Sequence, residues 1–130
     1  MATIELTKEN FESVLDGGGL VLVDFWAAWC GPCRMFGPVF QRVSEQNPDA
    51  VFGKVDTEAQ PELAGSFGIS SIPTLMIIRD KVVLYAQPGA LPQPALEQLI
   101  SQAREVDMDE VRASIARDAA PAAGRPPAAE

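Results

Sequence analysis

Both cysteines of this 130-residue chain lie in one short segment, VDFWAAWCGPCRMF, where Gly31 and Pro32 separate Cys30 from Cys33. A Cys-x-x-Cys pair can supply half of a metal site, close a small structural disulfide loop, or act as a redox-active dithiol. The residues around the pair, and the elements expected to hold it, favour one of these three uses.

The metal site and the structural disulfide are the weaker two interpretations. A closed zinc site takes four Cys or His ligands, whereas this chain has two cysteines and no histidine. It could complete such a site only across a dimer or with carboxylates. A disulfide between Cys30 and Cys33 closes a very small loop, which removes unfolded-state entropy worth on the order of 1–2 kcal/mol or less.

A redox role accounts for the residues that surround the pair. The apolar run LVLVDFWAAW, residues 20–29, predicts a strand buried on both faces, with a helix starting at the cysteines. Free N–H groups at the helix start would stabilise a Cys30 thiolate and lower the pKa of that thiol. Pro32 fits the first helical turn, where no N–H is needed. We expect Cys30 to be exposed and Cys33, one turn deeper, to be shielded and to resolve a mixed disulfide on Cys30.

A charged residue, Asp24, interrupts the apolar strand shortly before Cys30. Its neighbours are apolar, so we expect a buried carboxyl group with a raised pKa, able to accept a proton. A strand-edge aspartate with its carboxylate in water is the alternative. Lys54, in the next expected strand, is the candidate partner of Asp24, or else a surface lysine.

The rest of the chain alternates between strand and helix patterns, which predicts an α/β fold with helices on both faces of one mixed sheet. Thr7 is expected to cap the first helix. The last two strands are expected to form a hairpin through Asp80 and Lys81. We expect strands near residues 3–6, 20–29, 50–56, 74–79 and 82–86, and helices near 8–16, 34–46, 61–67, 94–106 and 107–118.

Composition and charge limit the classes of protein. The chain is 47% hydrophobic with a net charge of −8, which suits one soluble domain and argues against nucleic acid as a partner. No signal-peptide pattern or membrane-length apolar run is found, so we expect a cytoplasmic monomer without membrane contact. We expect the domain over residues 1–106, a short extra helix over 107–118 and a disordered Ala/Pro-rich tail over 119–130.

Several motifs together resemble the bacterial thioredoxin family. The string WCGPC at residues 29–33 is preceded by VDFWAA and followed by KVD at 54–56, SIPTL at 71–75 and PGAL at 88–91. Their order and spacing match the family from about residue 3 to residue 106. The five-residue active-site string is highly specific, and the flanking motifs make coincidence very improbable.

The resemblance implies the thioredoxin fold, three layers α/β/α around a central mixed five-stranded sheet. It implies that Cys30 is the nucleophile and Cys33 the resolving thiol. It also implies that Asp24 transfers a proton to and from Cys33, and that Lys54 tunes Asp24.

The resemblance further implies that Gly31 and Pro32 set the redox potential. It implies a cis peptide bond before Pro73, whereas the general frequency of X–Pro bonds favours trans. An apolar patch that docks partners would consist of Trp29, Gly31, Pro32, Ile72, Pro73, Gly89 and Ala90.

By resemblance, the activity is reduction of protein disulfides with no bound cofactor or metal. Electrons would come from NADPH through a flavin-dependent thioredoxin reductase and pass to targets such as ribonucleotide reductase, peroxiredoxins or methionine sulfoxide reductases. A Gly-Pro pair and the absence of histidine place the potential near the reducing end. Two alternatives remain: a disulfide isomerase or oxidase, and a binding module in which the thiols have no role.

A few residues depart from the family pattern. Thr57 stands where many relatives have a branched apolar residue near the active site, which makes that side of the patch more polar. Ala28 replaces a charge or a proline before the active-site Trp. Asp80 and Lys81 replace a turn that more often contains glycine, and the extension from about residue 107 has no counterpart in a minimal thioredoxin.

Overall fold

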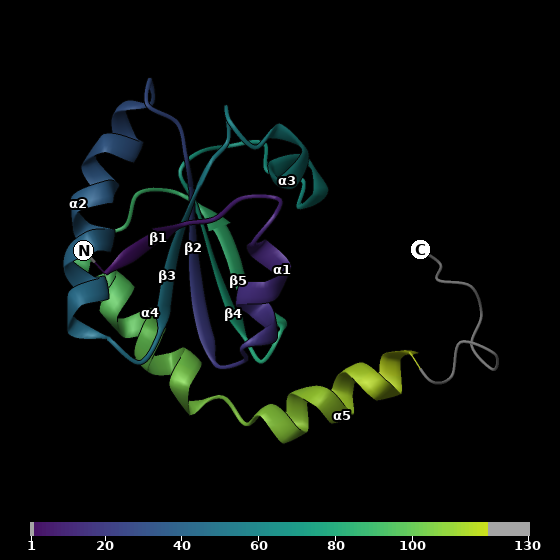
Figure 1. Cartoon of the computed structure of the whole chain (residues 1–130). Helices are drawn as coiled ribbons and strands as arrows, with labels where there is room; N and C mark the ends of the chain where they lie inside the picture. Colours follow the sequence, from purple (N-terminus) through teal and green to yellow (C-terminus); the bar gives the residue numbers. More distant parts are fainter. Residues whose placement is uncertain (1, 120–130) are drawn as a thin grey trace.

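The structure is a computed structural model that describes residues 2–119. Its centre is a mixed sheet of five strands in the order β1-β3-β2-β4-β5 (Figure 1). The pairs β1–β3 and β2–β3 are parallel, whereas β2–β4 and β4–β5 are antiparallel. The strands are β1 (Thr3–Glu5), β2 (Leu20–Trp26), β3 (Val51–Asp56), β4 (Thr74–Arg79) and β5 (Val82–Pro88).

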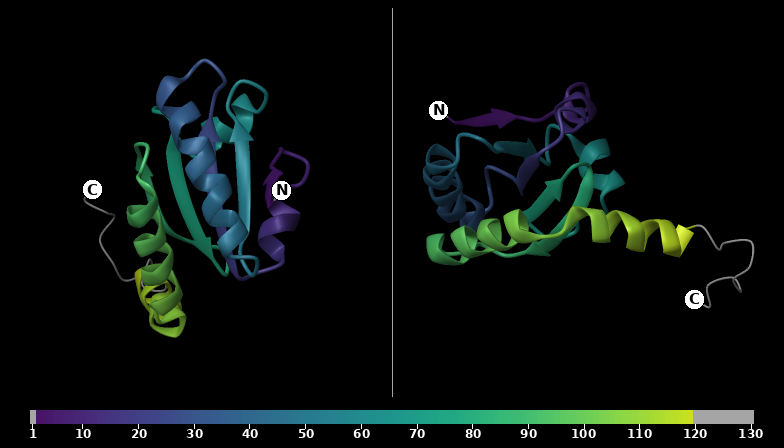
Figure 2. Two further views of the ribbon diagram at one scale, coloured as in Figure 1. Left: turned by 90° about the vertical axis from the view of Figure 1, so that its left-hand side faces the viewer. Right: turned by 90° about the horizontal axis from the view of Figure 1, so that it is seen from below.

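Helices cover both faces of this sheet, α2 and α4 on one face and α1 and α3 on the other (Figures 1 and 2). The element order confirms the predicted α/β architecture. Among residues 2–119, no helix is both long enough and apolar enough to cross a membrane. The helices are α1 (Phe11–Asp16), α2 (Gly31–Gln46), α3 (Pro61–Ser66), α4 (Gln93–Glu105) and α5 (Met108–Ala119).

Strand β2 lies at the centre because it is apolar on both faces. Successive side chains of a strand point to opposite faces, so Leu22 packs with α2 and α4 while Val23 and Phe25 pack with α1 and α3. Asp24 has the same parity as Leu22, which places its carboxyl group on the face covered by α2. The strand therefore positions Asp24 beneath the helix that carries the cysteines.

The predicted cap of the first helix is wrong. Helix α1 begins at Phe11 with Asn10 as N-cap, and no side chain caps it. Thr7 and Asn10 instead stabilise the turn before the helix. The Thr7 N–H donates to Asn10 Oδ1 at 2.7 Å, and the Asn10 N–H donates to Thr7 Oγ1 at 3.3 Å.

The β4–β5 turn is built from Asp80 and Lys81, as predicted, and both have positive φ angles, 51° and 70°. The turn is fixed from outside. Asp80 makes two hydrogen bonds with Gly19. The Asp80 N–H donates to the Gly19 carbonyl oxygen at 3.0 Å, and the Gly19 N–H donates to Asp80 Oδ1 at 3.0 Å. Lys81 pairs with Asp16 at 3.0 Å. These contacts hold a conformation that non-glycine residues rarely adopt.

Helix α5 follows α4 after a break at Val106, whose backbone is extended. The Asp107 carboxylate accepts a hydrogen bond from the Glu110 N–H at 3.2 Å and so caps the new helix. Met108 is buried, and Arg112 lies 3.8 Å from Asp80. The helix then projects beyond the end of the sheet (Figure 2). The predicted disordered tail, apart from Ala119, lies outside the described residues.

Candidate active site

The two cysteines form a disulfide at the N-terminus of α2, with a Cα–Cα distance of 5.2 Å. Cys30 is the N-cap residue in extended conformation, and Pro32 occupies the first turn. The Cys33 N–H donates to Cys30 Sγ at 3.2 Å. This hydrogen bond and the positive end of the helix dipole both face the Cys30 sulfur, where they would stabilise negative charge.

The expected difference in exposure between the cysteines is wrong for the oxidised pair. Cys30 and Cys33 are each 4% exposed, and both pack with Ala27 and Ile72. The sulfur of Cys30 lies 3.7 Å from the Ile72 carbonyl oxygen. Cys30 is covered because the disulfide and the 71–73 loop hold its sulfur against the protein.

Asp24 is fully buried, and neither of its carboxyl oxygens has a hydrogen-bond partner among the described residues. Burial raises the pKa of Asp24 to about 7, and the positive charge of Lys54 opposes part of this shift. The predicted burial is confirmed. A carboxyl group with such a pKa exchanges its proton near neutral pH.

Lys54 is the register neighbour of Asp24 across the β2–β3 pair. The two side chains form no ion pair within 4.0 Å among the described residues. The Lys54 ammonium instead lies over the Trp26 ring, 4.9 Å from its centroid. A hollow of about 370 Å³ lies beside Lys54 and is also lined by Cys33 and Arg34. Lys54 therefore acts on Asp24 as a nearby charge rather than as a bonded partner.

Three loops meet at the disulfide. The Ile72–Pro73 peptide bond is cis. The family resemblance implied this conformation, whereas the general frequency of X–Pro bonds favoured trans. The Gly89 N–H donates to the Pro73 carbonyl at 2.8 Å, which joins the 88–90 loop to this position. The segment 27–33 lies opposite, through the contact of Cys30 with Ile72. The structure thus brings together the positions predicted for the docking patch.

The predicted members of the patch differ in exposure, and among them Gly31 is half-buried and Pro73 is buried. Trp29 is 67% exposed. Pro32, Gly89 and Ala90 are also exposed, whereas Ile72 is half-buried. The indole Nε1–H of Trp29 donates to Glu58 Oε2 at 3.1 Å.

Two contacts of this loop were missed by the sequence analysis, the Glu58 contact and a bond from Arg34 to the Ala28 carbonyl. Both Glu58 and Arg34 are exposed and charged, and nothing in the sequence around them distinguishes them from other surface residues. Thr57, identified as a departure, donates from its N–H and Oγ1 to the Trp26 carbonyl at 2.9 and 3.0 Å.

The arrangement defines a class of protein. A disulfide at a helix start, with a buried carboxyl group beneath it and an apolar patch around it, is suited to exchange of disulfides with other molecules. Residues 2–119 contain no group of three or more side chains suited to a metal ion.

Comparison with known proteins identifies the family. The thioredoxin family model matches residues 2–102. A Streptomyces coelicolor protein with the provisional name thioredoxin 2 is 63% identical over 121 residues, covering 93% of this chain and 90% of that protein. Thioredoxin of Bacillus subtilis is 38% identical over 103 residues, 78% of this chain and 98% of its own.

A solved structure agrees with this match. A mutant thioredoxin from Halobacterium salinarum superposes with a TM-score of 0.73 at 31% identity, covering 81% of this chain and 92% of that chain. The chain belongs to the thioredoxin family. It is a thiol-disulfide oxidoreductase, a protein-disulfide reductase with a redox-active Cys30–Cys33 pair.

Proposed function

We propose that reduction proceeds through a mixed disulfide on Cys30. The Cys30 thiolate attacks one sulfur of a target disulfide, and the other target sulfur leaves as a thiolate. The Cys33 thiolate then attacks Cys30 Sγ, which closes the Cys30–Cys33 disulfide and releases the second target thiol. Two electrons pass from this protein to the target. The observation that carries this assignment is the Cys33 N–H donated to Cys30 Sγ at the helix start.

We propose that Asp24 removes the proton from the Cys33 thiol in the second step. Asp24 lies on the sheet face covered by α2, has no competing hydrogen bond among residues 2–119, and titrates near neutral pH. Lys54 tunes this group because its charge favours the ionised form. Water in the hollow beside Cys33 would carry the proton onward.

We propose that Gly31 and Pro32 set a reducing potential, because they place no charge or histidine between the cysteines. The patch would dock partners around the disulfide, chiefly through its exposed members Trp29, Pro32 and Ala90. A flat, uncharged surface suits many extended substrates. Its members are Trp29, Gly31, Pro32, Ile72, Pro73, Gly89 and Ala90.

We also propose the cellular context that is typical of the family. The oxidised pair would be reduced by a flavin-dependent thioredoxin reductase with NADPH, and the protein itself would bind no cofactor. It would act as a monomer in the cytoplasm, without nucleic-acid or membrane partners. Residues 1–106 would form the catalytic domain, so deletion of residues 107–130 should leave reductase activity per folded molecule unchanged.

The proposal is tested by reduction of insulin with NADPH and a bacterial thioredoxin reductase. We expect the wild-type protein to reduce insulin catalytically, Cys30→Ser to be inactive, and Cys33→Ser to accumulate a one-to-one mixed disulfide through Cys30. Trapping through residue 33 in a Cys30→Ser variant would reverse the assigned roles. Failure of the wild-type protein to reduce insulin would support a binding module instead.

A further inference from the structure

The loop that carries Trp29 is buried at its two ends and exposed at its corner. Residues 27–30 join β2 to α2, and the Cys30 N–H donates to the Ala27 carbonyl at 3.2 Å to close a turn. Ala28 and Trp29, at the corner of this turn, are exposed. Ala27 and Cys30, at the two ends of the loop, are buried and belong to one apolar cluster, so the contacts that reach the exposed corner between them bear most on its geometry.

Arg34 contacts this corner from the first turns of α2. Its Nη1 donates to the Ala28 carbonyl oxygen at 3.0 Å. Its backbone N–H donates to the Cys30 carbonyl oxygen at 3.2 Å. The guanidinium has no carboxylate within ion-pair distance in residues 2–119, and the bond to Ala28 comes from a charged donor, which makes it stronger than a bond between neutral groups.

The corner is therefore held from two directions. Glu58, which follows β3, accepts the Trp29 indole N–H and restrains the side chain. Arg34 restrains the backbone on the preceding residue. We propose that Arg34 is a positioning residue that holds the 27–30 loop in one conformation, so that Trp29 and Cys30 meet a protein disulfide already arranged for docking.

This inference rests on the proposed docking role of Trp29. A loop that is already ordered loses less entropy when a partner binds, which strengthens binding without any new contact. Arg34 should therefore affect substrates that use the docking patch. A small aromatic disulfide, which reacts with Cys30 without covering the patch, should be nearly insensitive to Arg34.

The test compares Arg34→Ala and Arg34→Lys with wild type and with Arg42→Ala. Arg42 is the matched control, because it is also an exposed arginine of α2 whose side chain donates a hydrogen bond, to Gln93 at 2.9 Å. For Arg34→Ala we expect KM for insulin to rise about three- to tenfold, the effect of losing one modest hydrogen bond. The kcat for insulin and the rate with 5,5′-dithiobis(2-nitrobenzoate) should stay within about twofold.

A second measurement does not depend on activity. In Arg34→Ala, backbone order parameters of residues 28–30 from NMR relaxation should fall from about 0.85 toward about 0.6. Arg34→Lys, which keeps the charge, should recover part of both effects, and Arg42→Ala should show neither.

Unchanged KM and unchanged order parameters in Arg34→Ala would overturn the inference, and so would an equal loss of rate with both substrates. Failure of the proposed function would look different, because the wild-type protein itself would then not reduce insulin.

Discussion

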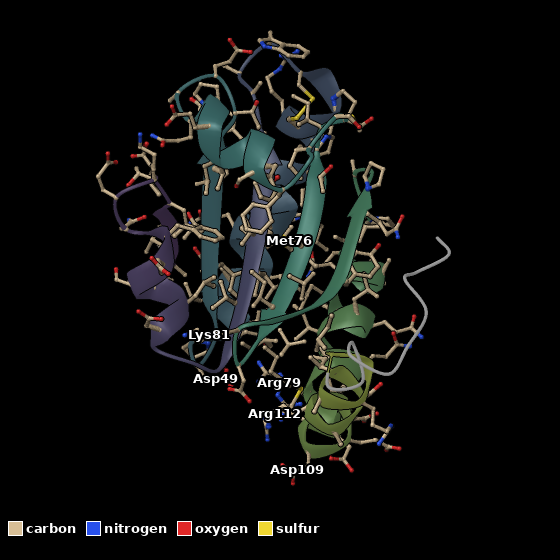
Figure 3. All side chains as sticks on the ribbon, turned by 90° about the vertical axis from the view of Figure 1, so that its right-hand side faces the viewer. Asp49, Met76, Arg79, Lys81, Asp109 and Arg112 are labelled. Carbon is tan, nitrogen blue, oxygen red and sulfur yellow. A yellow bond between two sulfur atoms is a disulfide. The ribbon has the colours of Figure 1, made fainter. Side chains whose placement is uncertain are left out.

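The two ends of the central sheet differ in whether their polar side chains have hydrogen-bond partners. At the end opposite the disulfide, Arg79 Nη1 is shared among the carbonyls of Ala103, Arg104 and Val106 at 2.9–3.1 Å, which satisfies the C-terminus of α4. Arg104 in turn binds Asp49 through two hydrogen bonds. Figure 3 shows Arg79 and Asp49 of this cluster at the bottom and the disulfide, a yellow bond, at the top.

At the disulfide end, the central ionisable group, Asp24, has no hydrogen-bond partner among the described residues. Asp24 lies in β2, the strand beside Arg79, yet both carboxyl oxygens are unpaired among the described residues. An unpaired buried carboxyl group destabilises a fold, whereas a shared guanidinium stabilises one. The contrast teaches that polar groups with satisfied partners build this fold, and it supports our proposal that the unsatisfied Asp24 serves the chemistry.

The largest expected effect is the influence of Asp24 on how the free energy of unfolding depends on pH. Its folded pKa of about 7 lies above the unfolded value near 3.9, so the native state binds more protons between these values. The free energy of unfolding of the wild type should therefore fall as pH rises from about 4 to about 7. The Asp24→Asn variant has no carboxyl group to titrate at this position. Its free energy of unfolding, measured relative to that of the wild type, should therefore rise by about 4 kcal/mol as the pH goes from 4 to 8.

Urea unfolding across that pH range measures the effect. Asp16→Asn, which changes an exposed carboxylate paired with Lys81, is the control and should follow the wild-type curve closely. Parallel curves for Asp24→Asn and wild type would show that Asp24 is not buried with a raised pKa.

The same substitution should slow the chemistry even though it stabilises the fold. In the proposed mechanism deprotonated Asp24 accepts the Cys33 proton, so resolution of the mixed disulfide should accelerate as pH rises through about 7. In Asp24→Asn this inflection should disappear and the rate at pH 8 should fall roughly a hundredfold. Stopped-flow release of a fluorescent target thiol gives the profile. An inflection that persists unchanged in the variant would assign it to another group.

At the opposite end, loss of Arg79 should affect stability alone. Arg79→Met keeps the length of the side chain but leaves the α4 carbonyls unsatisfied, so we expect a loss of about 2 kcal/mol. Arg104→Met, which breaks a more exposed pair, should cost less. Thermal unfolding and insulin reduction per folded molecule measure both properties. A lowered activity in Arg79→Met would mean that the two ends are coupled.

The smallest effect is expected in the β4–β5 turn. Lys81 has a φ of 70°, which costs a non-glycine residue about 1 kcal/mol. Lys81→Gly should therefore stabilise the protein by up to about 1 kcal/mol. Lys81→Ala is the control, since it loses the contact with Asp16 without relieving the backbone. Equal stability of the two variants would show that the turn holds no such strain.

The strongly patterned parts of the fold were predictable from sequence. The near-continuous apolar run of β2 indicated a central strand, and the single charge within it indicated Asp24. The cis bond at Pro73 was predictable only through the family, because the local sequence does not distinguish it from an ordinary strand start.

What the sequence did not reveal depends on contacts between distant residues. Glu58 meets Trp29, and Arg79 meets the end of α4, only after the sheet has assembled. The cover over Cys30 likewise comes from Ile72, far along the chain, so the helix-start pattern alone predicted an exposed sulfur. Thr7 was misassigned because a turn and a helix cap use the same residue types.

The most direct test of the central claim is the reduction potential of the Cys30–Cys33 pair. The protein is equilibrated in dithiol/disulfide buffers of defined ratio, and the fluorescence of Trp26 and Trp29 reports the oxidised fraction. We predict a midpoint near about −270 mV, the value typical of thioredoxins. A midpoint of about −180 mV or higher, as in proteins that donate or shuffle disulfides, would contradict a reductase function.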